Sequence, residues 1–375
     1  MSHTKSLLLK IRAAIEDGRL SGRQVPIADM KQCVIQELQV NRGTFTEQQY
    51  TEVLYRFDIM CGNIPEDVED KEKLLLLTDA LLLCTDMISQ TVYALANKDY
   101  WLFKHGREAE NQEIGGIIDY IGKERRIDLI SYDFVKEYRN LSVPVYADEN
   151  CGMRFVLHKQ KKMYFPRRWD EEKIVHYYRS VVMEQDSRSP HCYDCASYGV
   201  EKGDIVVDAG AAEGIFSLDC LERVSRIYLI EADPDWIEAL ERTFCEERAK
   251  VQIIHGFLDN FHDGIHVNID TLFDGEEINY IKMDIEGAEK AALAGAHRTM
   301  EKNENIRCAI CSYHCREDEQ SIRGTLEDLG FTVETSRGYM CPDWTMEAYL
   351  EAELRRGIVF GRKVGETCHG GRTAV

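Results

Sequence analysis

The feature that most constrains the fold is an alternation of strand-like and helix-like segments between residues 199 and 363. Short apolar runs rich in Val, Ile and aromatic residues predict buried strands, and the segments between them show helical spacing. The predicted strands are 204–210, 226–233, 251–256, 278–287, 306–314, 331–336 and 357–363, and the predicted helices are 214–224, 235–247, 288–300 and 317–330. This alternation predicts an α/β fold with a mostly parallel sheet and helices on both faces.

The rest of the chain divides by composition. Residues 1–140 are expected to be mainly helical, residues 141–198 to form a β-hairpin and a helix, and residues 364–375 to be a C-terminal tail. The most apolar stretch, 73–96, carries Asp79 and Asp86 and predicts a buried amphipathic helix rather than a membrane span. With no secretion signal recognisable, a cytoplasmic protein is expected, and the N-terminal helices are a candidate surface for a homo-oligomer.

Charge and cysteine content narrow the partners. The formal net charge of −20 argues against broad binding of nucleic acid or anionic membranes. The 13 cysteines are expected to be reduced thiols. The spacings Cys192-x-x-Cys195 and Cys308-x-x-Cys311, the latter followed by His314 and Cys315, resemble zinc-ligand spacing. No closed set of four ligands is evident, so we expect no metal site.

The predicted hairpin within 143–169 is basic and aromatic, unlike the chain as a whole. Its cations are Lys159, Lys161, Lys162, Arg167 and Arg168. Charge runs usually face water, so a solvated hairpin is the favoured interpretation. The alternative is a local site for an anion or for a substrate.

A glycine loop follows the first predicted strand of the sheet. Asp208 ends the apolar run, and Gly210 and Gly214 bracket the turn into a helix. Ligands of such sheets bind at the carboxyl ends of the strands. The dinucleotide fingerprint G-x-G-x-x-G fails, because Ala212 and Ile215 stand at its second and third glycine positions. The acid Glu213 in the loop suits a ligand with positive charge or hydroxyl groups.

Two more strand ends carry acids. Glu231 ends the next strand, 23 residues after Asp208, where a carboxylate can accept hydrogen bonds from ribose hydroxyls. Asp233 and Pro234 predict a helix N-cap and first turn. Asp284 ends the strand in "IKMDIEGAE" and could orient a hydroxyl group, contact a cofactor or act as a general base, whereas Glu289 has a structural interpretation at the helix start.

The segments "VVDAGAAEGIFSL", "YLIEAD" and "IKMDIEGAEKAALAGA", in this order, resemble the FkbM-type family of S-adenosylmethionine-dependent methyltransferases. "CSYHCREDE", with His314 followed by Cys315 and Arg316, is similar to a further motif of that family. The resemblance covers residues 199–363. It implies a class I methyltransferase fold, with a seven-stranded sheet whose last strand is antiparallel. It also implies methyl transfer, most often to a hydroxyl oxygen of a sugar, glycan or other natural product.

The resemblance also implies roles for particular residues. His314 and Asp284 are the expected catalytic residues, with His314 as first choice of base because imidazole titrates near neutral pH. The expected S-adenosylmethionine-binding residues are Asp208, Gly210, Ala211, Glu213, Gly214, Glu231, Ala232, Phe257 and Asp284. Asp284, Glu286 and Glu289 could hold magnesium, but one acidic turn does not supply ligands from separate loops, so no metal is expected.

Two alternatives from other classes stay open at this point. One is an NAD(P)-dependent oxidoreductase, which the failed glycine fingerprint weakens. The other is a binding module without catalytic activity on the same fold, because a fold does not determine a function. The expected partner is a small-molecule or glycan acceptor.

Overall fold

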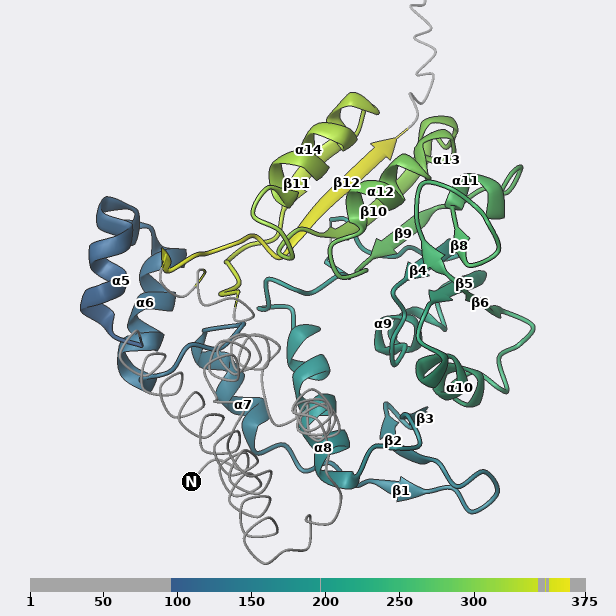
Figure 1. Cartoon of the computed structure of the whole chain (residues 1–375), viewed down its shortest axis with the longest axis horizontal. Coiled ribbons are helices and arrows are strands. Elements are labelled where there is room, and N and C mark those ends of the chain that lie inside the picture. Colours follow the sequence, from purple (N-terminus) through teal and green to yellow (C-terminus); the bar gives the residue numbers. More distant parts are fainter. Residues whose placement is uncertain (1–95, 196, 343–347, 349–350, 365–375) are drawn as a thin grey trace, which may run out of the picture. The chain divides into compact units, whose positions relative to one another are not determined.

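The structure is a computed structural model that describes residues 96–195, 197–342, 348 and 351–364 (Figure 1). The predicted helix at 73–96 lies outside these residues except for Ala96, as do the rest of 1–95 and the tail from 365 onwards. The described residues fall into two compact units, described separately here. One holds those up to Tyr132 and those between Cys341 and Leu354, and the other holds Asp133–Met340 and the residues from Arg355.

The described part of the first unit is helical. Its helices are α5 (Lys98–His105), η2 (Gly106–Glu110) and α6 (Gln112–Glu124). Asn111 caps α6 by accepting a hydrogen bond from the amide of Glu113 at 2.8 Å. The buried face of α6 consists of isoleucines at helical spacing, namely Ile114, Ile117, Ile118 and Ile121. Across the described residues, we find no helix with the length and apolar character that a membrane crossing requires.

The second unit begins with short elements that precede the large sheet. They are η3 (Asp133–Val135), α7 (Lys136–Arg139), β1 (Tyr146–Ala147), β2 (Arg154–His158), β3 (Lys161–Tyr164) and α8 (Glu171–Glu184). β2 and β3 form the predicted antiparallel hairpin, and β1 adds a third strand that was not predicted. Asp170 caps α8 through the amide of Lys173 at 2.8 Å.

A seven-stranded sheet forms the centre of this unit, in the order β11-β12-β10-β9-β4-β5-β6. The strands are β4 (Ile205–Ala209), β5 (Arg226–Glu231), β6 (Val251–His255), β9 (Tyr280–Met283), β10 (Asn305–Cys311), β11 (Thr332–Thr335) and β12 (Ile358–Val364). β12 runs antiparallel to both of its neighbours, and β6, β5, β4, β9 and β10 pair in parallel. The mostly parallel sheet and the antiparallel last strand that the sequence predicts are therefore confirmed.

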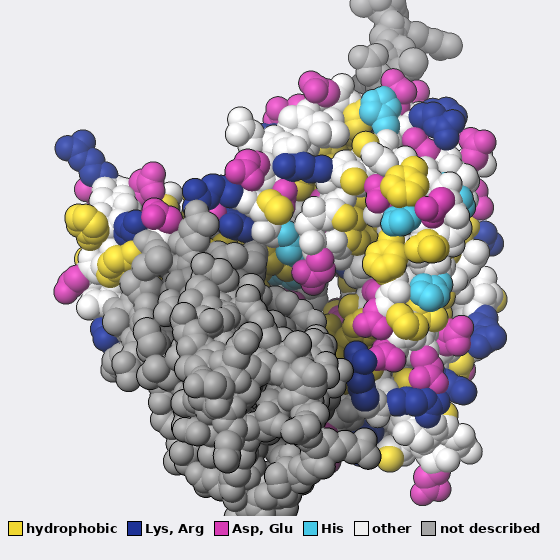
Figure 2. All heavy atoms as spheres, in the orientation of Figure 1, with side chains coloured by type: hydrophobic (Ala, Val, Ile, Leu, Met, Phe, Trp, Pro, Cys, Tyr) yellow, Lys and Arg dark blue, Asp and Glu magenta, His cyan; other side chains and the backbone are white. Residues whose placement is uncertain are grey.

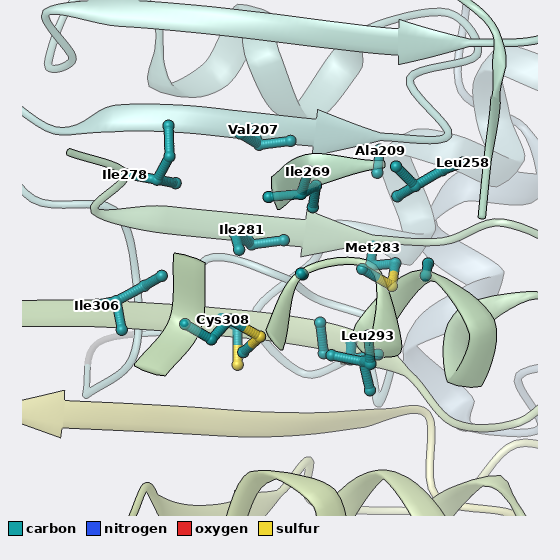
Figure 3. Packing of buried hydrophobic residues seen from close by; sticks show 14 of the residues in the cluster. Val207, Ala209, Leu258, Ile269, Ile278, Ile281, Met283, Leu293, Ile306 and Cys308 are labelled. Carbon is teal, nitrogen blue, oxygen red and sulfur yellow. The ribbon is translucent and has the colours of Figure 1, made fainter. Parts of the chain in front are cut away.

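One face of the sheet packs on helices that follow β8. These are α11 (Ile269–Leu272), α12 (Glu289–Ala294), α13 (His297–Lys302) and α14 (Asp318–Asp328). Alternate strand residues such as Val207 and Ala209 of β4 and Ile281 and Met283 of β9 point into this core (Figure 3). Because strand side chains alternate between faces, Asp208 and Lys282 point to the other face.

The other face is covered by α9 (Ile215–Cys220), α10 (Pro234–Thr243) and the segment that follows α8. Phe216 of α9 stacks on Tyr280 of β9 at 5.8 Å between ring centroids, and Tyr198 stacks on Phe360 of β12 at 5.6 Å. Asp233 caps α10 and Pro234 opens it, as predicted. Helices therefore cover both faces, with the carboxyl ends of β4, β5 and β9 left at one edge (Figure 1).

The structure differs from the prediction in two places. The single helix predicted over 288–300 is two helices, α12 and α13, because the chain turns at Gly295, where a Cβ would lie 2.3 Å from the carbonyl oxygen of Asp259. The chain between β6 and β9 also holds a small parallel pair, β7 (Phe257–Leu258) with β8 (His266–Val267), before α11. These strands are too short for a periodic signal.

Candidate active site

A cavity of about 520 Å³ opens at the carboxyl ends of β4, β5 and β9. Such a volume is typical of small-molecule sites. One side is formed by the loop after β4, the end of β5 and the residues after β6. The opposite side, which we call the α8 wall, is formed by Tyr177, Ser180, Val181 and Glu184 of α8 with Gln185, His191 and Tyr193. The cavity therefore lies where ligands bind in open α/β sheets.

The loop after β4 is held tightly against the end of β9. Gly210 has a φ of +73°, and a Cβ at this position would lie 1.7 Å from the carbonyl oxygen of Asp284. Its amide donates to the carbonyl oxygen of Ile230 at 2.9 Å. Gly210 is therefore a glycine because the protein's own backbone approaches it. Gly210 and Ala211 line the cavity, whereas Gly214 is not among the lining residues and instead begins α9.

Asp208 lies under this loop in a buried ion pair. Lys282 faces Asp208 in the parallel register of β4 and β9, and its Nζ lies 3.1 Å from Asp208 Oδ1. The Lys282 ammonium also donates to the carbonyl oxygens of Ala209 and Gly210 at 3.3 and 2.6 Å. Burial opposes this charge, but the carboxylates of Asp208 and Asp284 raise the pKa of Lys282 above its ordinary value. Lys282 thus ties Asp208 to the glycine loop.

Glu231 ends β5 with its carboxylate at the cavity. One oxygen accepts from the amide of Ala212 at 2.9 Å, and the other accepts from the amides of Ala232 and Asp233 at 2.7 and 2.8 Å. A carboxylate has about four acceptor sites, so these bonds fix its orientation and leave acceptor capacity for a ligand. Ala232 and Phe257 also line this end of the cavity, and the Phe257 side chain is about half exposed.

Asp284 lies at the end of β9, where the cavity meets the α8 wall. The hydroxyl of Tyr193 donates to Asp284 Oδ2 at 2.6 Å. His191 Nε2 lies 3.5 Å from the same oxygen, and His314 Nε2 lies 3.4 Å from Oδ1. Burial alone would raise the pKa of Asp284. That pKa is nevertheless held well below its usual range by His191, Lys282 and His314. Asp284 is therefore an ionised hydrogen-bond acceptor, which makes it a weak base.

His314 lies behind Asp284 and is not among the lining residues of the cavity. Its Nδ1 lies 3.1 Å from Oε1 of Glu289, a fully buried carboxylate that also accepts from the amide of Ile285 at 3.0 Å. Burial lowers the pKa of His314, but Glu289, Asp284 and Glu286 outweigh it and raise that pKa to about 9. An imidazolium at neutral pH cannot accept a proton, which disfavours His314 as the general base and favours a positioning role. The structural interpretation of Glu289 agrees with its contacts.

Two further carboxylates occupy the cavity between the loop and α8. Glu213 accepts from the hydroxyl of Tyr177 at 2.7 Å, and burial raises the pKa of Glu213. Glu184 lies 3.7 Å from Nδ1 of His191. Burial raises the pKa of Glu184 to about 7, against the lowering effect of His191. A carboxyl group that titrates near neutral pH is suited to proton exchange with a ligand.

Residues 263–333 match the model of the methyltransferase FkbM domain family. The resemblance to the FkbM-type family is confirmed. The matched segment contains β9, Asp284 and His314, and the glycine loop and Glu231 precede it. The match supports methyl transfer as the chemistry of this chain.

Solved structures of methyltransferases resemble the chain at low identity. The methyltransferase FkbM from Methylobacillus flagellatus KT is 17% identical over 52% of this chain and 55% of its own, with a TM-score of 0.36. This chain thus spans about half the length of that protein. Precorrin-6y C5,15-methyltransferase from Geobacter metallireducens GS-15 is 12% identical over 45% of this chain and 84% of its own, with a TM-score of 0.32. A methyltransferase-like protein from Streptococcus mutans, solved with S-adenosylhomocysteine (SAH), is 16% identical over 44% of this chain and 91% of its own. Its TM-score is also 0.32. No curated protein sequence matches the chain.

The structure brings most of the predicted site residues to one cavity. The predicted residues that line it are Asp208, Gly210, Ala211, Glu213, Glu231, Ala232, Phe257 and Asp284. Two predicted residues, Gly214 and His314, are not among the lining residues. The sequence prediction missed the α8 wall and Lys282. A lysine inside the otherwise apolar strand "YIKM" is a signal that could have revealed Lys282, because a buried ammonium requires a carboxylate partner. The α8 wall has no such local signal.

The cations of the basic hairpin take part in ion pairs. Its cations pair with carboxylates of the same unit, and Figure 2 shows Lys and Arg side chains beside Asp and Glu side chains over α10 and the hairpin. The pairs are Lys159–Asp219, Lys161–Glu222, Lys162–Asp148, Arg167–Glu238 and Arg168–Asp235. The charges therefore attach the hairpin to other segments of the same unit, and the alternative of a local substrate site is disfavoured.

The cysteine spacings do not assemble a closed zinc site. Cys308 packs in the core cluster, whereas Cys311 lies 3.5 Å from Nε2 of His191 on the opposite face of β10. Donor atoms of His191, Asp284 and Cys311 do lie within 4.8 Å of one another. The Tyr193 hydroxyl lies among them, however, at 2.6 Å from Asp284 and 3.2 Å from His191, so hydrogen bonds already join these groups.

Proposed function

We propose that this protein is an S-adenosylmethionine-dependent methyltransferase that methylates a hydroxyl oxygen of a sugar, glycan or other natural product. The observation that carries the proposal is the Glu231 carboxylate, which three backbone amides, one of them from the glycine loop, orient at the cavity. This arrangement suits the two hydroxyl groups of a ribose. The segment from Asp208 to Gly214 would then hold the methionine part, and Phe257 would pack beside the adenine.

The residues present fit this cofactor. The Glu231 oxygens retain acceptor capacity, and the six lining carboxylates suit a ligand that carries a sulfonium and an ammonium group. When bound, S-adenosylmethionine supplies an activated methyl group on sulfur. The protein's contribution is then to align the acceptor oxygen with that group and to exclude water.

Asp284 is the residue we assign to the acceptor oxygen. Its carboxylate lies in the cavity, is ionised, and can accept a hydrogen bond from a hydroxyl group. Tyr193 and His191 contact one of its oxygens and His314 the other, which fixes its orientation. In this scheme His314 is a positioning residue, held by Glu289, rather than the base.

The experiment is calorimetric titration of the purified protein with SAH and, separately, with NAD. We expect saturable binding of SAH and none of NAD. Glu231→Ala should weaken SAH binding by about a hundredfold, because it removes charge-assisted hydrogen bonds worth about 1.5–3 kcal/mol each. Glu241→Ala, at an exposed position on α10, is the control for removing a glutamate outside the cavity and should bind as the wild type does. Binding of NAD in place of SAH would instead support the oxidoreductase.

A further inference from the structure

The α8 wall contributes a carboxylate whose charge is not balanced within the cavity. Glu184 lies at the last residue of α8, and its side chain is 22% exposed. Its Oε2 lies 3.7 Å from Nδ1 of His191. His191 also lies 3.5 Å from Asp284, so one imidazole stands between two carboxylates.

The cavity lining is strongly acidic as a whole. Its carboxylates are Glu184, Asp208, Glu213, Glu231, Asp284 and Glu286. Among the lining residues that the structure describes, Lys282 is the one Lys or Arg, and Asp208 and two backbone carbonyl groups occupy its ammonium. Within this described lining, an anionic acceptor such as a sugar phosphate or a uronic acid would meet six carboxylates and a lysine that is already paired.

The pKa of Glu184 reflects the same acidic surroundings. Burial raises its pKa to about 7, and the carboxylates of Glu213, Asp284 and Glu286 also raise it, against His191. A positive charge placed in the cavity would stabilise the ionised form of Glu184. The wall therefore favours a cationic ligand over a neutral or anionic one.

Aromatic rings stand beside one of these carboxylates, Glu213, which accepts a hydrogen bond from the hydroxyl of Tyr177 at 2.7 Å. Tyr177 and Trp236 both line the cavity, with 5.5 Å between their ring centroids, and Trp169 packs on both at 5.0 and 5.1 Å. Aromatic faces attract ammonium groups, most strongly where water is partly excluded. Carboxylates and aromatic rings together are a combination that recognises protonated amines.

We propose that Glu184 and the α8 wall form a cation-binding subsite, so that the acceptor of the methyl group is a hydroxyl compound that also carries a protonated amine, such as an amino sugar. The inference rests on the proposed function, because it assigns the part of the cavity beyond the cofactor. Asp284 would contact the hydroxyl group, and Glu184 would contact the ammonium group.

The first test compares SAH with sinefungin, its analogue that carries a primary amine where the cofactor carries the methyl group. We expect sinefungin to bind more tightly than SAH at pH 8, where Glu184 is ionised. Glu184→Gln should lower the sinefungin-to-SAH affinity ratio about tenfold, and Glu172→Gln, an exposed acid on the same helix, should leave it unchanged. An unchanged ratio in Glu184→Gln overturns the inference.

The second test uses the SAH-loaded protein and three sugars. D-glucosamine should bind more tightly than N-acetyl-D-glucosamine and D-glucuronate, and Glu184→Gln should remove the difference. Equal binding of the three, a preference for the anion, or no binding of the amine overturns the inference. Either failure with SAH still bound leaves the proposed function standing, whereas failure of the wild type to bind SAH contradicts the proposed function itself.

Discussion

The two sides of the cavity are built differently. On the glycine-loop side, two carboxylates are balanced by groups close to them: Asp208 by Lys282, and Glu231 by three backbone amides. On the α8 side, Glu184, His191 and Tyr193 come from a separate part of the chain and meet Asp284 only in the folded protein. The difference indicates that the first side holds a fixed ligand, whereas the second leaves charge for a variable one.

The largest effect is expected where the glycine-loop side is most rigid. Gly210→Ala would place a Cβ 1.7 Å from the backbone oxygen of Asp284 at a φ of +73°. We expect a loss of about 4 kcal/mol or more in unfolding free energy, together with loss of SAH binding. Gly203→Ala is the control, because its φ is +93° but nothing lies near the added Cβ, so it should cost about 1 kcal/mol. Urea unfolding measures both variants, and an equal loss of unfolding free energy in the two would contradict the tight packing of the loop.

A second test separates charge from shape on the same side. Lys282→Met leaves Asp208 buried without its partner, which should cost about 3 kcal/mol of unfolding free energy. The double variant Lys282→Met/Asp208→Asn removes both charges and should recover a large part of that loss. Urea unfolding measures the unfolding free energy of the single and the double variant. A single variant within about 0.5 kcal/mol of the wild type would show that the ion pair does not support the loop.

The acceptor side should respond to pH through His314. Its pKa is raised from 6.5 in the unfolded chain to about 9 in the folded protein, so its contribution to stability is fully present below about pH 6.5. The contribution is lost as pH rises through 9. We expect the stability difference between wild type and His314→Gln to shrink by on the order of 2 kcal/mol between those limits. A difference independent of pH would show that His314 is not an imidazolium held by Glu289 and Asp284.

The smallest effect is expected at the hairpin, outside both sides of the cavity. Arg167 and Arg168 form exposed ion pairs with Glu238 and Asp235. Exposed pairs contribute about 0–1 kcal/mol each, so Arg167→Ala/Arg168→Ala should lower stability slightly and leave SAH affinity unchanged. Calorimetry and urea unfolding test both statements. Loss of methyl transfer in a fully stable double variant would restore the interpretation of the hairpin as a substrate site.

The sheet and the strand-end acids could be predicted because their signals are local. Apolar runs that end in Asp208, Glu231 and Asp284 identify three parallel strands, and parallel strands place their carboxyl ends at one edge. The group that makes glycine necessary at Gly210, however, is the backbone carbonyl of Asp284. Only the register of β4 and β9 reveals this contact.

The α8 wall could not be predicted, because it depends on contacts between distant segments. Tyr193 and Asp284 are 91 residues apart, and Tyr177 and Glu213 are 36 apart. The same reason applies to two sets of charges. The carboxylates that raise the pKa of His314 come from other segments, and so do most partners of the hairpin cations, on α9 and α10.

A crystal structure of the protein with SAH tests the central claim most directly. We expect the ribose hydroxyls to donate to the Glu231 carboxylate and the adenine to lie beside Phe257. The homocysteine part should lie along Asp208–Gly214, with its sulfur directed toward Asp284 and the α8 wall. A ligand bound away from Glu231, or with its sulfur directed away from Asp284, would contradict the assignment of the two sides.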